Sequence, residues 1–144
     1  MSVSDRRPPF RFAVRTRVGF DETDAQGIVY YGRYMPYFDR ARVEYLRHLG
    51  LLRAGDDGAE FVMRAQYVEY HAPARFDDEL EVYVRVRRLG RTSVTWEFQA
   101  WNVASDEHLA TSTQTAVYVA HRRPVPVDGG MREAVAAFDR EVES

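Results

Sequence analysis

The sequence predicts an α+β domain in which an antiparallel sheet of about five strands curls around one long central helix. Three observations lead to this prediction: an alternating apolar segment near the N-terminus, a long segment of helical period, and several extended segments after it. The chain has 144 residues, 45% of them hydrophobic, which fits a single domain over residues 1–144 with a substantial core.

The first two elements differ in the spacing of their apolar residues. Between Phe12 and Phe20 every second residue faces one side, which predicts a half-buried strand. From about Gly32 to Leu49 the spacing becomes three or four, which predicts a helix of about five turns with Pro36 near its start and Gly50 after its end. Aromatic and other apolar side chains surround more than half of this helix, as expected if a sheet curls around it; they are Tyr34, Met35, Tyr37, Phe38, Ala41, Tyr45 and Leu49.

The rest of the chain is predicted to be extended until its last residues. A loop at Gly55 to Gly58 leads into an extended segment, Phe61 to Tyr70, whose alternation is less clear. Three alternating segments follow, separated by hairpins at Gly90 and at Ser105–Asp106. Their predicted rows are Leu80, Val82, Val84 and Val86, then Val94, Trp96, Phe98 and Ala100, then Leu109, Thr111, Thr113, Thr115, Val117 and Val119.

The spacing of apolar residues near the end of the chain predicts a short helix, and the uncovered face of the sheet indicates a second copy of the chain. Met131, Val135, Phe138 and Val142 have helical spacing. One long helix covers one face of a sheet, so we expect a second copy of the chain to cover the other face.

Composition excludes several classes of chemistry. All 20 basic residues are arginine, which excludes a Schiff base, a pyridoxal phosphate site and a P-loop lysine. The absence of cysteine excludes a thiolate nucleophile and a cysteine zinc site, and the four histidines have no metal-ligand spacing, so no metal is expected. A net charge of -2 argues against a nucleic-acid partner.

Hydropathy predicts a cytoplasmic protein without a membrane span. No run of about 18 apolar residues occurs, and the polar first residues do not resemble a signal peptide.

The segment Gly19 to Tyr34 concentrates acidic residues between the first strand and the helix. Asp21, Glu22 and Asp24 are typical of turns and of residues that precede a helix. The same residues also fit a reactive site, because Gly27 and Gly32 let the backbone approach a ligand and amides at a helix start face developing negative charge. Residue types alone leave both interpretations open.

The string E-T-D-A-Q-G-I-V-Y-Y-G-R-Y, followed by Y-F-D-R-A-R-V-E-Y-L-R-H-L-G, resembles the signature of the hotdog-fold acyl-CoA thioesterases. The similarity is to the 4-hydroxybenzoyl-CoA type and the related Tol-Pal-associated enzymes. Later segments agree with it: Y-H-A-P-A-R-F-D-D-E-L-E-V, G-R-T-S-V-T-W-E-F and R-P-V-P-V. The resemblance implies thioester hydrolysis of an aromatic or short-to-medium acyl-CoA, with coenzyme A as part of the substrate and no separate cofactor.

Carried over residue by residue, the resemblance makes Asp24 the catalytic carboxylate, as nucleophile or as general base. The oxyanion donors become the backbone amides of Tyr31 and Gly32. Asp21 and Glu22 become structural neighbours. Tyr31 stands where the Tol-Pal-associated enzymes commonly have histidine, so a histidine-assisted mechanism is not expected.

The resemblance also implies a substrate site and an assembly. The substrate-binding residues are expected to be Gly27, Tyr30 and Tyr34. Coenzyme A phosphates suit arginine, and the candidates are Arg88, Arg91, Arg122 and Arg123. Members of the family form homodimers with the active site at the interface, and a dimer of dimers stays open.

Two other functions share the fold. A hotdog dehydratase needs a histidine and an acid at other places, and no histidine precedes His48. A non-catalytic dimer that binds acyl-CoA would keep the fold with an idle site, since a fold alone does not determine function. His71 is expected to be a structural histidine, with a place in a pocket wall as the alternative.

Overall fold

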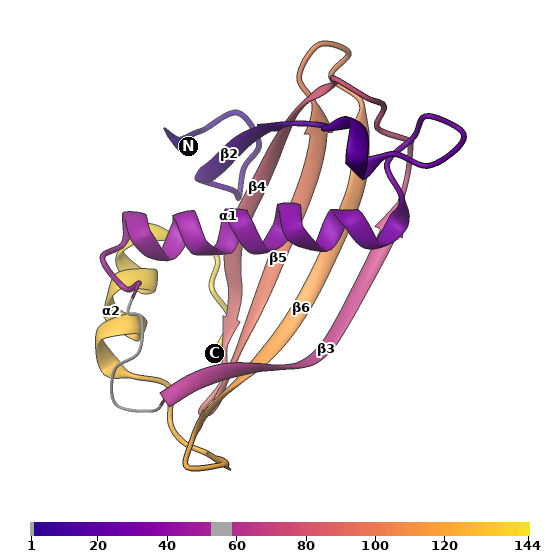
Figure 1. The fold of residues 1–144 in the computed structure, drawn as a ribbon. Coiled ribbons are helices and arrows are strands. Elements are labelled where there is room, and N and C mark those ends of the chain that lie inside the picture. Colours follow the sequence, from indigo (N-terminus) through magenta and orange to yellow (C-terminus); the bar gives the residue numbers. More distant parts are fainter. Residues whose placement is uncertain (1, 53–58) are drawn as a thin grey trace.

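The computed structural model describes residues 2–52 and 59–144, and it shows an α+β domain (Figure 1). The loop predicted at Gly55 to Gly58 lies outside the described residues. One antiparallel sheet has the strand order β1-β2-β4-β5-β6-β3, and β7 pairs with β6. The strands are β1 Ser2–Val3, β2 Phe12–Arg17, β3 Ala59–Tyr70, β4 Glu79–Leu89, β5 Ser93–Asn102, β6 His108–Ala120 and β7 Arg123–Pro124. The five longer strands are those predicted from the sequence, and β1 and β7 are additional two-residue strands.

Helix α1, Tyr34–His48, lies across one face of the sheet (Figure 1). A 3-10 turn, Tyr31–Arg33, precedes it, so the α-helix begins two residues later than predicted. The predicted aromatic stripe is confirmed, because Tyr34, Tyr37, Phe38, Ala41 and Tyr45 are all buried. The helix ends at His48, one residue before the predicted end at Leu49. Gly50 follows it as predicted, and its φ of 71° is in the left-handed region that favours glycine.

The strand predicted from Phe12 to Phe20 ends at Arg17. Alternation continues in the sequence, but the Val18 backbone turns away to bond Asp77 and Asp78 of the β3–β4 connection. Phe20 then lies in a 3-10 turn, Phe20–Glu22, where 77% of it is exposed. The prediction was wrong for these last residues because a loop, and not a neighbouring strand, supplies the hydrogen-bond partners.

The row predicted along β6 begins in the core at Leu109 but faces the outer side of the sheet from Thr111 onward. Ser112 pairs with Phe98, Gln114 with Trp96 and Ala116 with Val94, and all six residues are buried beneath α1. Thr111, Thr113, Thr115 and Val117 therefore lie on the outer face of the sheet. Small and polar residues fill the inner row because the large side chains of β5 and α1 already occupy that space.

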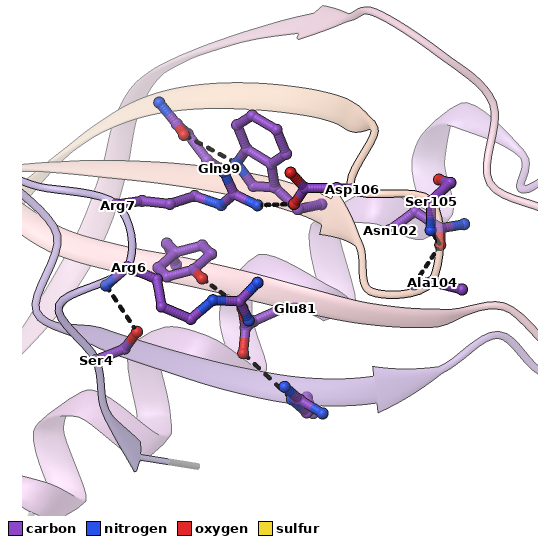
Figure 2. Close-up of polar contacts among 12 residues, drawn as sticks. Ser4, Arg6, Arg7, Glu81, Gln99, Asn102, Ala104, Ser105 and Asp106 are labelled. Atoms are coloured by element: carbon purple, nitrogen blue, oxygen red, sulfur yellow. Dashed lines mark hydrogen bonds and ion pairs between the residues drawn. The ribbon is translucent and has the colours of Figure 1, made fainter.

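The N-terminal segment covers part of the outer sheet face (Figure 2). Phe10, Ala13 and Tyr83 form a second buried cluster there, with Trp101 packed against it. The Arg7 guanidinium lies 3.4 Å from the centre of the Trp101 ring and pairs with Asp106. The expectation that a second copy covers this face is wrong for this region, because residues 2–11 of the same chain supply the cover.

Helix α2, Gly129–Phe138, closes the end of the core near the end of α1 (Figure 1). The prediction of a short C-terminal helix is confirmed, although Val142 lies beyond its end. Asp139 directly follows the helix and is 7% exposed. Its Oδ2 accepts hydrogen bonds from the Tyr45 hydroxyl at 2.6 Å and from the Val86 amide at 2.8 Å, which ties α2 to both α1 and β4.

Strand β3 forms an open edge of the sheet. Among the described residues it has a strand, β6, on one side only. Its large apolar side chains stay exposed on both faces; they are Phe61, Val62, Met63, Tyr67 and Tyr70. A long apolar edge of this kind is a surface on which another strand can pair.

None of the helices in residues 2–52 and 59–144 is long and apolar enough to cross a membrane.

Candidate active site

Asp24 lies in a tight turn between β2 and α1. Its Oδ1 accepts the Gln26 amide at 2.8 Å and the Ile28 amide at 3.4 Å, and its own amide donates to the Ile28 carbonyl at 2.9 Å. Gly27 closes the turn with a φ of 77°. Asp24 is exposed, and no described residue donates a hydrogen bond to its Oδ2. The turn thus fixes the carboxylate and leaves one oxygen open to solvent.

Glu22 holds the base of the same turn. Its Oε1 accepts the Gly19 amide at 2.7 Å, and its carbonyl accepts the Tyr30 amide at 3.2 Å. Tyr37 of α1 lies next to it, where burial raises the pKa of the tyrosine hydroxyl and the Glu22 carboxylate raises it further. Glu22 therefore joins the Asp24 turn to the start of the helix.

Tyr31 and Gly32 begin the helical segment seven and eight residues after Asp24. The first amides of a helix have no acceptor within the helix. These two N–H groups, together with the helix dipole, form the positive end of the longest helix in the described structure. Both amides predicted as oxyanion donors therefore lie at the start of the helical segment.

Aromatic rings surround the start of the helix. Tyr30 is 58% exposed and Tyr31 is 64% exposed, with ring centres 6.2 Å apart. The ring centre of Tyr70, at the end of β3, lies 5.1 Å from that of Tyr31 and 5.4 Å from that of Tyr34. Tyr34 itself is 2% exposed, so it belongs to the core behind Tyr70, while Tyr30 and Tyr31 form the accessible surface.

The four candidate arginines lie at the other end of the sheet. Ser93, next to the hairpin that carries Arg88 and Arg91, pairs with Val117 on β6, and β6 leads to Arg122 and Arg123. Tyr70 pairs with Ala110, seven residues before Val117, which corresponds to about 23 Å along the strand. Within one chain, these arginines are therefore distant from the Asp24 turn.

Arg122 lines a cavity of about 480 Å³ that the sequence does not predict. Arg64 and His121 lie in its wall with Glu60, and the apolar lining residues are Val62, Met63, Val117 and Val119. His121 and Arg122 form a two-residue turn with φ values of 51° and 65°, a left-handed conformation that costs non-glycine residues about 1–2 kcal/mol each. Arg91 instead lies beneath α2, where its carbonyl accepts the Val127 amide.

His71 belongs to a small stack on the outer sheet face. Its Nε2 lies 3.0 Å from the Thr111 hydroxyl, which also lies 3.1 Å from His108 Nε2. The His108 ring stacks on Trp101 at 4.4 Å, and burial lowers the pKa of His108. The contacts of His71 fit a structural role.

A family model described as the thioesterase superfamily matches residues 26–107, which is more than half of the chain. The chain belongs to this superfamily. The matched region contains Gly27, the start of α1 and strands β3 to β5, and it begins two residues after Asp24.

Relatives extend the similarity of this thioesterase over most of its length. The acyl-CoA thioesterase YbgC of Haemophilus influenzae is 30% identical over 130 residues, covering 88% of this chain and 93% of the relative. A structure from Aquifex aeolicus superposes with a TM-score of 0.81 at 33% identity, covering 86% of this chain and 98% of that one. The structure of a gentisyl-coenzyme A thioesterase superposes with a TM-score of 0.77 at 25% identity, and the match covers 87% of this chain and 99% of that one.

The hotdog fold and the thioesterase activity expected from the sequence are therefore confirmed. The roles of individual residues in this thioesterase stay predictions. Asp24 and Gly27 lie in the turn that precedes Tyr30, Tyr31 and Gly32, and the Glu22 carbonyl, which accepts the Tyr30 amide, joins that turn to the helix start. The sequence did not predict Tyr70, which reaches the helix start from the end of β3. It also did not predict Arg64 and His121, which line the cavity with Arg122.

Proposed function

We propose that the chain hydrolyses acyl-CoA thioesters at the start of α1. The observation that supports this is the Asp24 carboxylate, fixed through Oδ1 in a tight turn that leads within eight residues to the Tyr31 and Gly32 amides. Attack on a thioester places negative charge on the carbonyl oxygen. Each preorganised amide commonly contributes about 3 kcal/mol to stabilising such charge.

Two routes use the same carboxylate. As a nucleophile, Asp24 forms a bond to the acyl carbon, the carbon–sulfur bond breaks, and water then hydrolyses the mixed anhydride. As a general base, Asp24 takes a proton from water while that water attacks the acyl carbon. Both routes release a carboxylic acid and the thiol of coenzyme A.

The acyl group is proposed to be aromatic or of short to medium length. Tyr30 and Tyr31 offer exposed ring faces beside the helix start, and Gly27 keeps the neighbouring turn open. One similar enzyme is named for an aromatic acyl-CoA, the gentisyl thioester. Tyr34 is buried and contacts Tyr70, whose ring contacts Tyr31, so Tyr34 is not expected to touch the acyl group directly.

Thiol release from a panel of acyl-CoAs tests the function. We expect turnover of benzoyl-CoA, phenylacetyl-CoA and butyryl-CoA, and poor turnover of palmitoyl-CoA. Binding of acyl-CoA without any turnover would instead indicate a binding protein that uses the same fold.

The coenzyme A phosphates are proposed to bind the cationic cavity lined by Arg122, with Arg64 and His121 beside it. Arg88, Arg91 and Arg123 lie at the same end of the sheet but do not line the cavity. Replacing Arg122 with alanine is expected to raise KM for acyl-CoA roughly fivefold, with kcat within twofold, since exposed charge contacts contribute about 1 kcal/mol.

A substrate that lacks the nucleotide tests whether Arg122 acts on the coenzyme A phosphates. An N-acetylcysteamine thioester carries the same acyl group but no nucleotide, so its KM should be equal for wild type and Arg122→Ala. Equal KM values for acyl-CoA as well would exclude Arg122 as a phosphate ligand.

Pairing of two copies through β3 would bring the cavity lined by Arg122 in one copy close to the Asp24 turn and helix start of the other. A twofold axis pairs identical edges antiparallel, which brings residues 60–64 of one copy beside residues 66–70 of the other. The cavity of one protomer would then lie near the helix start of its partner. This arrangement accounts for the distance of about 23 Å that separates them within one chain.

We therefore expect a homodimer, with a mass twice 16.7 kDa by sedimentation equilibrium at micromolar concentration. A fully active enzyme that sediments as a monomer would contradict a site shared between copies. A mass four times that of the chain would show that two dimers associate.

A further inference from the structure

The Tyr70 hydroxyl joins the edge strand of the sheet to the start of the helix. Tyr70 is the last residue of β3 and lies on the same sheet face as α1, where its hydroxyl donates to the Tyr31 carbonyl at 3.2 Å. Its ring is flanked by the rings of Tyr31 and Tyr34. The contact lies at the 3-10 turn that carries both proposed oxyanion donors.

The Tyr31 carbonyl and the Gly32 N–H are two ends of one peptide unit. A peptide unit is planar and trans, so fixing the direction of the carbonyl also fixes the opposite direction of the N–H. A hydrogen bond accepted by the carbonyl polarises the unit and strengthens its N–H as a donor. Gly32 has no side chain of its own through which its amide could be held in place.

We propose that Tyr70 is a positioning residue for hydrolysis, which orients and polarises the peptide unit whose Gly32 N–H binds the oxyanion. This inference rests on the proposed function, because it assigns a role toward that same transition state. The Tyr34 amide also donates to the Tyr31 carbonyl, which therefore accepts one bond from the helix and one from the sheet. Two bonds occupy the two lone pairs of the oxygen and hold the unit from both sides.

The hydroxyl is suited to permanent donation. Burial raises the pKa of Tyr70, and the neighbouring Tyr31 raises it further, so the phenol stays protonated near neutral pH. Tyr70 reaches the turn from the strand that is proposed to form the dimer edge, so pairing of two copies would restrain the same contact.

Tyr70→Phe keeps the ring and removes only the hydroxyl. We expect kcat to fall about 5- to 10-fold with KM within twofold, less than the 100-fold or more that follows complete loss of an oxyanion donor. Tyr67→Phe is the matched control, because Tyr67 lies on the same strand, faces the other side of the sheet and is 61% exposed. It should leave kcat and KM unchanged.

Incorporation of 3-fluorotyrosine at position 70 keeps the ring and the hydroxyl but makes the hydroxyl a stronger hydrogen-bond donor. Polarisation of the peptide unit predicts a kcat above that of wild type at neutral pH, whereas a purely structural contact predicts no change from wild type. An unchanged kcat in Tyr70→Phe, or an effect confined to KM, would overturn the inference while leaving the proposed function intact. An inert wild type across the acyl-CoA panel would instead remove the proposed function itself.

Discussion

Replacing Asp24 with asparagine is expected to lower kcat for acyl-CoA hydrolysis at least about 100-fold, the scale of losing a positioned acid–base or nucleophilic group. A neutral amide neither attacks the acyl carbon nor accepts a proton from water. Asparagine is the informative replacement because its amide oxygen can still accept the Gln26 N–H that Oδ1 accepts now. The turn should therefore keep its shape while the charge is lost.

Asp21→Asn is the matched control for this experiment. Asp21 lies in the same acidic segment and is exposed like Asp24, but it belongs to the preceding 3-10 turn, and the Gln26 and Ile28 amides bond Asp24 instead. We expect its kcat to stay within about threefold of wild type, in line with the small effects of exposed charges. Comparable losses in both variants would indicate a general effect of negative charge, and retention of activity in Asp24→Asn would exclude the carboxylate as the reacting group.

Replacing Asp139 with alanine is expected to lower the free energy of unfolding by about 3 kcal/mol. The substitution leaves two donors without an acceptor: the Tyr45 hydroxyl, on a residue with 0% exposure, and the Val86 amide in β4. Each buried donor left unsatisfied costs about 1–3 kcal/mol. Urea unfolding at one fixed protein concentration measures the change, because association would otherwise shift the midpoint.

Asp139→Asn separates the hydrogen bonds from the charge. Burial raises the pKa of Asp139 above its ordinary value of 3.8, although Tyr45, Val86 and nearby arginines counteract the shift. The folded state then holds the proton more tightly than the unfolded state, so wild-type stability falls relative to Asp139→Asn as pH rises above about 3.8. A stability difference that stays constant with pH would contradict this assignment.

The sequence predicted those strands in which the residues of the two faces differ in hydropathy. In β4 and β5 one row of residues packs beneath α1 and the other faces outward, so period-two alternation is visible. Strand β3 shows no clear alternation because its apolar residues Phe61, Val62 and Met63 are exposed in succession on both faces. Such a pattern follows from an edge that the isolated chain leaves uncovered.

Local sequence also predicted the residues around the helix start, since Asp24 and the Tyr31 and Gly32 amides lie close together along the chain. Contacts across the fold were not predictable in this way. Tyr70 meets Tyr31 across 39 residues, and the N-terminal Arg7 meets Asp106 across 99. The inward row of β6 was also hidden, because Ser112 and Gln114 are polar residues that only the packing of α1 and β5 buries.

The most direct test is a crystal structure of the enzyme with a non-hydrolysable acyl-CoA analogue. We expect the carbonyl oxygen to lie about 3 Å from the Tyr31 and Gly32 amides, with the Asp24 carboxylate facing the acyl carbon. The nucleotide should contact Arg122 of the partner protomer. A carbonyl bound away from the start of α1, with Asp24 facing solvent, would contradict it.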